Sequence, residues 1–492
     1  MRKLGIYISL VFITGFFLAP SAAFGDMITT AQTRTREFIH TAAEPGTFAT
    51  AEKISNTVGE GIDWAFDQLI LLADSVQLGE LSKGIVHGVG TGFSDFKVED
   101  YANRGLDAIE DLSKRFWLQD FRRDVLQNQN SQVKIKPYFK IRMDYNSNVF
   151  YEPEAPKTRD EVVWVFTPGV SVQVPFGEDN RYRIGAVYEA RINEFTKYDE
   201  HDDIGQSFGA VANFKLTDDF TANVTEKFVQ DSARSGTRSS KRVEYMDQVV
   251  TPSVAYHWRN WSLEWEYQNA IRDFESAIYR TFAYANNAFT TRVLRDLTPQ
   301  VRGLVEYTFS HYDYAADETR VGYYNQFKTG IKGALSERTD VIARLGYQGR
   351  EYRAHDTQFD IPVFDFLLKH QLTEKAKLDF YFQRSLQESQ FTNNRAYDEK
   401  LGQFSGSYLF NEKLRGRVGG SLAQHKFQNE AATGALLIKR RDLIGSMFLG
   451  LDYAFRPWLV TNLDYRYERS NSNNSNFDYT NNVLSLGMSM PL

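Results

Sequence analysis

The C-terminal part of the chain contains the stretch Trp458-Leu-Val-Thr-Asn-Leu-Asp-Tyr-Arg-Tyr-Glu468, in which the residue types alternate with a period of two. Apolar and aromatic residues occupy mainly odd positions, whereas Asp464, Arg466 and Glu468 occupy even ones. This pattern predicts a β-strand whose two faces meet different surroundings. A short turn at 456–457 precedes the strand, and a polar loop at 470–476 separates it from a second strand at 479–490.

The same unit of strand, short turn, strand and polar loop repeats from about residue 132 to the end of the chain. Short turns recur about every 40 residues, which indicates a hairpin repeat. We predict eight of them, at residues 176–180, 217–219, 257–260, 298–299, 336–340, 373–375, 411–413 and 456–457. Longer polar segments lie between them, at residues 152–160, 196–203, 232–242, 312–319, 391–397, 428–438 and 470–476. Eight turns join sixteen strands, and one further strand at each end gives about eighteen, with sixteen as the alternative count.

The two faces of these strands indicate which kind of sheet they form. Residues 133–144 and 181–193 place several ionic groups in succession on one face, and apolar or aromatic residues on the other. A soluble antiparallel sheet with one solvated face also alternates and is the alternative. After the N-terminus no apolar run approaches the ~20 residues of a membrane helix. We therefore predict an all-β transmembrane antiparallel β-barrel in the outer membrane of a Gram-negative-type cell, with lipid outside, water inside and the short turns on the periplasmic side.

The first 131 residues differ from the predicted barrel, which spans residues 132–492. Arg2 and Lys3 are followed by an apolar run and by Ala23-Phe24-Gly25, which predicts a secretory signal peptide over residues 1–25. Residues 26–131 carry apolar positions at three- and four-residue spacing, as amphipathic helices do. We expect this helical segment either in the periplasm or as a plug in the barrel.

Catalytic and metal-binding motifs are not apparent in the sequence. The chain has no cysteine, and its 8 histidines stand singly, without a metal-ligand spacing. The cluster at 200–203, Glu-His-Asp-Asp, is either a cation site or a solvated loop tip, and we favour the loop tip because one loop rarely supplies enough ligands. The glycine-rich stretch 88–92 lacks the context of a phosphate loop. We predict no enzyme, cofactor or metal, and the formal net charge of −6 gives no reason to expect nucleic acid as a partner.

The ionic faces of the strands are the best functional candidates, because charges of both signs would line a polar channel. The alternative is that they form salt bridges between neighbouring strands and only solvate the wall. The candidate lumen-lining residues are Lys134, Lys136, Lys140, Arg142, Arg181, Arg183, Glu189, Arg191, Glu264, Glu266, Arg302, Glu306, Arg344, Arg415, Arg417, Asp464, Arg466 and Glu468.

Several motifs carry a resemblance to a known family. They are the stretch Asp144-Tyr-Asn-Ser-Asn-Val-Phe150, then Thr167-Pro-Gly-Val170 and Pro175-Phe-Gly177, and finally Tyr465-Arg-Tyr467 and Phe477-Asp-Tyr-Thr-Asn-Asn482. With them, residues 132–492 resemble the β-barrel porin type 2 family of outer-membrane proteins, many of which accompany genes for exopolysaccharide synthesis and export. These motifs are architectural, so the resemblance implies the barrel more directly than its cargo.

The C-terminus is similar to the assembly signal of outer-membrane barrels in Ser485, Gly487, Met490 and Leu492, although it ends in Leu where an aromatic residue is usual. The resemblance implies contact with outer-membrane lipid and with the barrel-assembly machinery. It also implies a role in exopolysaccharide export, with a polysaccharide cargo and periplasmic export components as partners. A general diffusion porin for small polar solutes, and a surface receptor or adhesion barrel, are the two alternatives.

Overall fold

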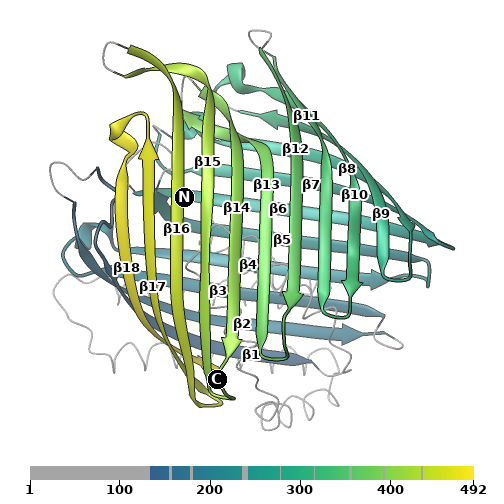
Figure 1. Ribbon diagram of the computed structural model, residues 1–492, viewed down its shortest axis with the longest axis horizontal. Helices are drawn as coiled ribbons and strands as arrows, with labels where there is room; N and C mark the ends of the chain where they lie inside the picture. The colour runs from purple at the N-terminus through teal and green to yellow at the C-terminus, as the bar shows by residue number, and fades with distance from the viewer. Residues whose placement is uncertain are drawn as a thin grey trace, which may run out of the picture. The chain divides into compact units, whose positions relative to one another are not determined.

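The computed structural model describes residues 133–153, 158–177, 181–234, 242–277, 279–314, 316–353, 357–391, 394–433 and 436–491. The predicted signal peptide and the predicted helical segment lie outside these residues. The described residues form one antiparallel sheet of 18 strands (Figure 1). These strands are β1 Lys134–Asn146, β2 Glu161–Phe176, β3 Tyr182–Phe195, β4 Asp203–Lys215, β5 Phe220–Arg234, β6 Arg242–Trp258, β7 Trp261–Phe274, β8 Tyr284–Asp296, β9 Val301–Asp313, β10 Gly322–Ser336, β11 Thr339–Tyr352, β12 Thr357–Gln371, β13 Ala376–Phe391, β14 Asn394–Leu409, β15 Leu414–Thr433, β16 Leu436–Arg456, β17 Leu459–Ser472 and β18 Tyr479–Pro491.

The sheet closes on itself, because the first strand pairs with the last. Tyr138 of β1 lies opposite Pro491 of β18, and the register continues to Asn146 opposite Val483. Each strand also pairs with its neighbour in the sequence, so closure leaves the sheet without an edge strand. The prediction of eighteen strands is confirmed, and both the sixteen-stranded barrel and the soluble open sheet are wrong.

The eight predicted short turns all connect an even-numbered strand to the next odd-numbered one, at what we call the turn end of the barrel. Three of them are built alike. Thr217, Thr298 and Asn411 each accept a hydrogen bond through the side-chain oxygen from the backbone N–H three residues later, at 3.0, 3.0 and 2.9 Å. Such side-chain contacts replace a strand partner where the chain reverses. They explain why a Thr or Asn follows a large apolar residue at these turns.

The connections at the opposite end, which we call the loop end, differ from the prediction in two ways. Two of them were missed, between β7 and β8 and between β11 and β12. The first carries the short helix η3, Arg280–Phe282, in a segment too aromatic to be recognised as a polar loop. In addition, β13 ends at Phe391 and β14 starts at Asn394, while β15 extends to Thr433 and β16 starts at Leu436, so the predicted loops at 391–397 and 428–438 are mostly strand.

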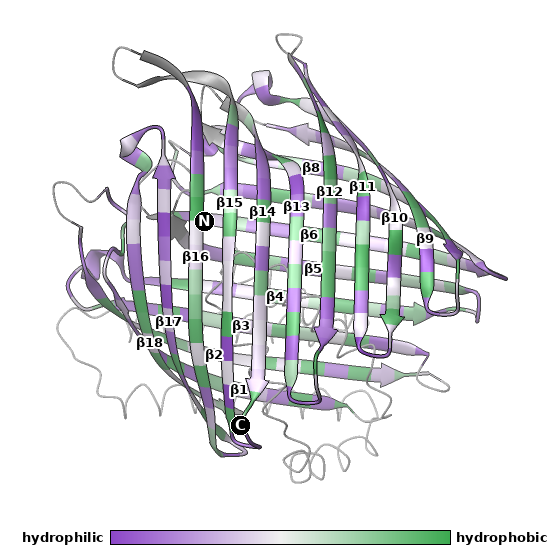
Figure 2. Cartoon of the chain, viewed as in Figure 1, coloured by the Kyte–Doolittle hydropathy of each residue, from purple (hydrophilic) through white to green (hydrophobic). Residues whose placement is uncertain are grey.

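The outward face of the barrel carries large apolar side chains that remain exposed. Leu345 is 65% exposed, Met447 60% and Leu449 58%. Strand register places Leu345 on the opposite face from Arg344 of its own strand, and Met447 and Leu449 on the opposite face from Asp464 and Glu468 of β17. Figure 2 shows this alternation of hydrophobic and hydrophilic residues along the strands. Exposed apolar side chains on this scale are unfavourable in water and favourable against lipid.

Short 3₁₀ helices, such as η2 (Asp199–His201), are the helical elements among the described residues. None of the helices in this part of the chain has the length and apolarity that a membrane span requires.

One seam departs from a simple barrel. Pairing between β12 and β13 stops at Phe364 opposite Arg384, whereas β12 continues with β11 to Tyr352 opposite Thr357. Beyond the seam, residues 385–389 of β13, which we call the inner segment, turn inside the wall. Leu386 has the parity of the outward-facing Phe382, yet it packs against the inward-facing Val363 and Ile361 of β12. The barrel wall therefore has two layers at this point of its loop end.

Candidate functional site: ionic groups inside the barrel

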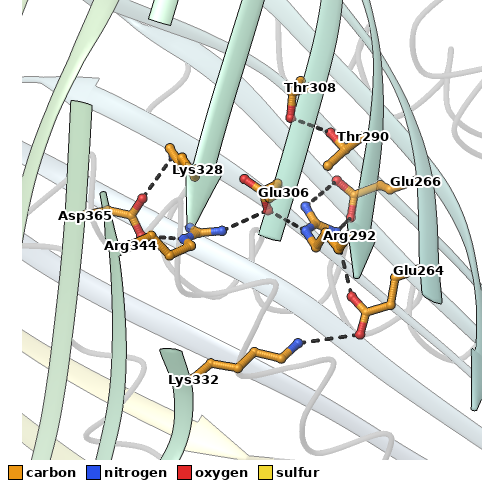
Figure 3. A network of polar contacts seen from close by, with 10 residues as sticks. All are labelled: Glu264, Glu266, Thr290, Arg292, Glu306, Thr308, Lys328, Lys332, Arg344 and Asp365. Atoms are coloured by element: carbon orange, nitrogen blue, oxygen red, sulfur yellow. Dashed lines mark hydrogen bonds and ion pairs between the residues drawn. The ribbon is translucent and has the colours of Figure 1, made fainter. Parts of the chain in front are cut away.

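A network of eight ionic side chains spans six neighbouring strands, from β7 to β12 (Figure 3). It contains four acids and four bases, namely Glu264, Glu266, Glu306 and Asp365 with Arg292, Lys328, Lys332 and Arg344. All of them alternate with outward-facing residues in strand register, which places them on the interior face.

Glu306 on β9 is the centre of the network. Its Oε2 accepts from Arg292 Nε of β8 at 2.5 Å and from Arg344 Nη1 of β11 at 3.1 Å. The Glu306 side chain is only 5% exposed, so the two guanidinium groups offset the cost of removing its charge from water. Such charge-assisted bonds are stronger than bonds between neutral groups.

The network extends from this centre in both directions around the wall. Arg292 Nη1 also reaches Glu266 Oε2 at 3.0 Å, and Arg344 Nε reaches Asp365 Oδ1 at 2.7 Å. The network ends on one side with Lys328, whose Nζ lies 2.9 Å from Asp365 Oδ2. It ends on the other side with Lys332, whose Nζ lies 3.5 Å from Glu264 Oε1. Because four positive and four negative groups are interleaved, the wall presents many hydrogen-bonding groups but no net charge from these eight residues.

A second ionic group joins β15, β16 and β17. Arg417 Nη2 lies 2.8 Å from Asp452 Oδ1 and 2.7 Å from Asp464 Oδ1, and the Arg417 side chain is 1% exposed. Gly450 lies beneath the pair, where an added Cβ would come within 2.3 Å of Asp464 Oδ1 and 3.0 Å of Arg417 Cζ. The missing side chain at position 450 therefore gives these charges the space to meet.

A third group joins β1 and β3 across β2. Tyr138 Oη and Lys140 Nζ both donate to Glu189 Oε1, at 2.6 and 3.0 Å. To reach it, the Tyr138 ring crosses Gly169 of β2, where an added Cβ would lie 2.4 Å from Tyr138 Cζ. The glycine in the Thr-Pro-Gly-Val motif is therefore explained by a ring that lies flat on the inner wall.

The other candidate lumen-lining residues lie on the same strands. Three have a partner nearby: Arg142 Nε is 2.9 Å from Asp144, Arg191 Nη1 is 3.2 Å from Asp231, and Arg302 Nε is 3.0 Å from Asp296. Glu468 accepts a hydrogen bond from the Tyr479 hydroxyl. Lys134, Lys136, Arg183, Arg415 and Arg466 occupy strand positions of the same parity, and Arg181 directly precedes β3. That all eighteen line a water-filled channel stays a prediction.

Sequence reasoning missed half of the eight-residue network, namely Arg292, Lys328, Lys332 and Asp365. At the inward-facing positions of β8 the only other ionic residue is Asp296 at the strand end, so no run of charges marked Arg292. The parity of Phe289 and Val293 on the outward face would have identified it. Asp365 lies in the stretch Pro362-Val-Phe-Asp-Phe-Leu367, which is apolar on both faces and obscures the alternation.

The inner segment is held in place by polar contacts at the loop end. Glu388 forms an ion pair with Arg350 of β11, and its Oε2 accepts from the Tyr314 hydroxyl at 2.5 Å. Gln348 Oε1 accepts from the Leu386 backbone N–H at 3.2 Å, and Arg320 Nη1 donates to the Ser389 carbonyl at 2.7 Å. These two side chains bond to the backbone of β13 where β12 no longer does.

Tyr314 lies in the connection between β9 and β10, outside the strands, and is 2% exposed. Its burial, and then the nearby Glu388 carboxylate, raise the pKa of Tyr314 well above the usual value. The hydroxyl is therefore protonated and can donate to Glu388 at any physiological pH. Titration of Tyr314 therefore does not break the contact between the loop and the inner segment in this range.

Two further sequence predictions concern the barrel ends. Ser485 and Gly487 lie in β18, opposite Asp144 and Arg142 of β1, and Met490 lies opposite Phe139. Leu492 lies outside the described residues. Three of the four residues of the predicted assembly signal therefore lie in the strand that closes the barrel, while recognition of the signal stays a prediction.

The cluster at 200–203 lies in and after η2, and its carboxylates bond within the loop. Asp202 Oδ1 accepts from the Phe195 backbone N–H at 2.7 Å, and Asp203 accepts from Asn193. Among the described residues no group of three or more His, Cys, Asp and Glu side chains is placed to hold a metal ion. Two of the cluster's three carboxylates thus have partners within the fold, and the preference for a solvated loop tip stays a prediction.

A closed antiparallel barrel with an apolar exterior and an ionic interior defines the class of outer-membrane β-barrels. The family model described as "Putative beta-barrel porin 2" matches residues 134–491. The match covers well over half of the chain, which therefore belongs to this family of porin-like channels. This confirms the family that the sequence motifs indicated. No curated protein matches the chain.

The chain is also similar to solved outer-membrane proteins. The protein opdK from Pseudomonas aeruginosa is 12% identical, with 73% of this chain and 98% of that chain covered and a TM-score of 0.40. Acinetobacter baumannii OccAB4 is 13% identical, with 74% and 99% covered and a TM-score of 0.42. The alcaligin outer membrane receptor FauA from Bordetella pertussis is 10% identical, with 72% and 76% covered and a TM-score of 0.35. Likenesses at this level carry no argument about substrate.

Proposed function

We propose that this outer-membrane barrel is a non-catalytic channel for an exopolysaccharide on its way out of the cell. The observation that carries the proposal is the charge-balanced network of eight residues on β7 to β12. Sugars carry many hydroxyl groups and are recognised by fixed donors and acceptors. An interior with one dominant sign of charge would instead select small ions.

Aromatic side chains at the loop end add to this support. Tyr312 and Tyr324 lie on the interior face beside Arg350, whose guanidinium carbon is 5.1 and 5.7 Å from the two ring centres. Both rings are partly exposed, so they can give a sugar an apolar face to stack on, whereas Arg350 itself is buried. The association of the family with export genes, stated above as what the resemblance implies, points to the same class of cargo.

Sidedness follows from the pattern of the connections. We place the turn end in the periplasm and the loop end outside the cell, as is general for bacterial barrels. A polysaccharide would then enter past the short turns, meet the eight-residue network, and leave past the inner segment. Periplasmic export components would deliver it, and the barrel-assembly machinery would recognise β18.

Gene deletion tests the proposal directly. A deletion strain should lose most of its extracellular polysaccharide and regain it with the intact gene. Complementation with an Arg292→Gln/Glu306→Gln variant, which removes the centre of the network but keeps its net charge, should restore the barrel in the membrane without full secretion. Secretion that is unchanged after deletion would refute the export role.

The alternative is a general diffusion porin for small polar solutes, which family membership also favours. Liposome-swelling assays with a series of neutral sugars separate the two functions. A diffusion porin admits monosaccharides and disaccharides in order of size. An export channel that opens only for its cargo admits them poorly, at the level of liposomes with no protein.

A further inference from the structure

Four basic residues lie on the outward face of β13 to β16, which are neighbours in the sheet (Figure 1). Strand register places Arg384 directly opposite Lys400, and Lys426 directly opposite Arg441. The two pairs are adjacent, because Lys426 also lies opposite Asp398, two residues from Lys400 on β14. Neighbouring strands are about 4.8 Å apart, so the four bases span a width of about 15 Å across the strands. We call these four residues the basic band.

The basic band borders the lipid-facing surface of the barrel. On each of the four strands, the next exposed apolar residue of the same parity lies two or four residues from the base, toward the turn end. These residues are Phe382, Phe404, Leu422 and Leu443, which are 44%, 41%, 54% and 41% exposed. The bases therefore lie where the apolar surface of the barrel ends on its loop side.

The charges within the basic band are unfavourable for the protein alone, since like charges directly opposite each other on neighbouring strands repel. Arg384 is compensated by Asp398, whose Oδ2 lies 2.9 Å from Arg384 Nη2. Among the described residues no acid forms an ion pair with Lys400, Lys426 or Arg441. Lys400 and Arg441 are also exposed. The band therefore offers three positive charges to an anion from outside the chain.

Four other strands carry acids at outward positions near the loop end. These acids are Asp273 of β7, Asp313 of β9, Glu351 of β11 and Asp360 of β12, and all four are exposed. The two signs of charge are thus separated around the rim of the barrel. A surface that only had to be hydrated would not need this separation, so the basic sector indicates a specific anionic partner.

We propose that the basic band binds the phosphorylated headgroup of a lipid in the outer leaflet of the membrane. With the loop end outside the cell, as placed above, the band lies at the depth of such headgroups. Phosphate oxygens accept charge-assisted hydrogen bonds from Lys and Arg, which offsets the repulsion within the band. The acyl chains then pack on the exposed apolar residues beside the band, a contact that a soluble polyanion cannot make. This site is independent of what the lumen carries.

Lipid binding to the purified, delipidated protein in mild detergent tests the site. Native mass spectrometry measures how much diphosphoryl lipid A, the phosphorylated disaccharide lipid of lipopolysaccharide, stays bound. The triple variant Lys400→Gln/Lys426→Gln/Arg441→Gln should bind at least tenfold less of this lipid than the unchanged chain. The unchanged chain should also bind the dephosphorylated form of the lipid at least tenfold less.

The matched control is Arg295→Gln/Arg338→Gln/Lys413→Gln. It removes three exposed bases as well, but at the turn end, and should bind lipid A as the unchanged chain does. Equal loss of binding in the two triple variants would overturn the proposal, because net charge alone would then explain it.

The remaining outcomes also decide the proposal. Equal binding by the unchanged chain and the triple variant of the basic band would overturn it, as would equal binding of the two forms of the lipid. Polygalacturonate is a further probe: if the unchanged chain binds this soluble polymer, the triple variant does not, and the two lipid forms bind equally, the band recognises an acidic polymer and the lipid site is refuted. Heat-modifiable migration on gels shows that each variant is folded. If the triple variant of the band does not fold, the comparison of the two lipid forms on the unchanged chain decides.

Discussion

The inner segment makes the sharpest prediction, because one of the contacts that hold it at the loop end is a largely buried ion pair. Glu388 has 13% of its side chain exposed and Arg350 has 4%, so the pair is largely out of water. The change Glu388→Gln keeps the shape of the side chain but removes its charge, leaving the Arg350 guanidinium buried beside a neutral amide. Losing one partner of a buried pair costs about 3–5 kcal/mol.

This free-energy cost destabilises only the state in which the inner segment is bound inside the wall (the seated state), because Arg350 becomes hydrated when the segment is released. The contacts from Gln348 and Arg320 to the β13 backbone remain, and each contributes about 1 kcal/mol. A net loss of about 3 kcal/mol shifts the equilibrium between the seated and the released segment by about 150-fold. We expect the segment to leave its place for a measurable fraction of the time.

Single-channel recording in planar bilayers measures this release. The Glu388→Gln variant should show frequent current steps that the unchanged protein lacks. Glu351→Gln is the control, since Glu351 neighbours Arg350 on β11 but is exposed and points outward. A Glu388→Leu/Arg350→Met double variant should again lack these current steps, because it leaves no unpaired charge. Identical traces for Glu388→Gln and the unchanged protein would refute the role of this pair.

Three further predictions concern the wall. Glu306→Gln adds one net positive charge to the eight-residue network and should shift permeability toward anions about fourfold, since a unit charge about 5 Å away in water contributes about 0.8 kcal/mol. Arg292→Gln should shift permeability toward cations. Reversal potentials in a salt gradient that stay unchanged in these variants would contradict both predictions. Arg417→Leu leaves Asp452 and Asp464 facing each other without their cation, and we expect a lower temperature of unfolding in detergent. The control is Arg469→Leu, which changes an exposed residue of β17 and should leave the unfolding temperature unchanged. Gly169→Val places side-chain atoms where the Tyr138 ring lies and should reduce the amount of folded barrel in the membrane, whereas the double variant Gly169→Val/Tyr138→Ala should recover it. Equal amounts of folded protein for the unchanged chain, the single variant and the double variant would show that the close approach of Tyr138 to Gly169 is unimportant.

The sequence by itself determined the barrel, its eighteen strands and its eight turns. It did so because a strand that separates lipid from water must alternate at every second residue, and each reversal at the turn end needs turn residues such as Thr298 or Asn411. The same alternation put Glu306 and Arg417 on the polar face without any knowledge of their neighbours. Connections at the loop end followed no such rule, since the connection between β7 and β8 is aromatic and β15 and β16 continue through residues that the sequence predicted as a loop.

Tertiary structure alone decided which charges meet and where the wall doubles. Arg344 reaches Glu306 on β9 and Asp365 on β12, and these partners are set by the register of neighbouring strands, which alternation leaves undefined. The inner segment is a stronger case. Leu386 has the parity of an outward-facing residue but is buried inside, because pairing with β12 ends at Phe364 and β13 follows β14 inward instead. A period of two tells the faces of a strand apart, but the direction of each face depends on the strands beside it.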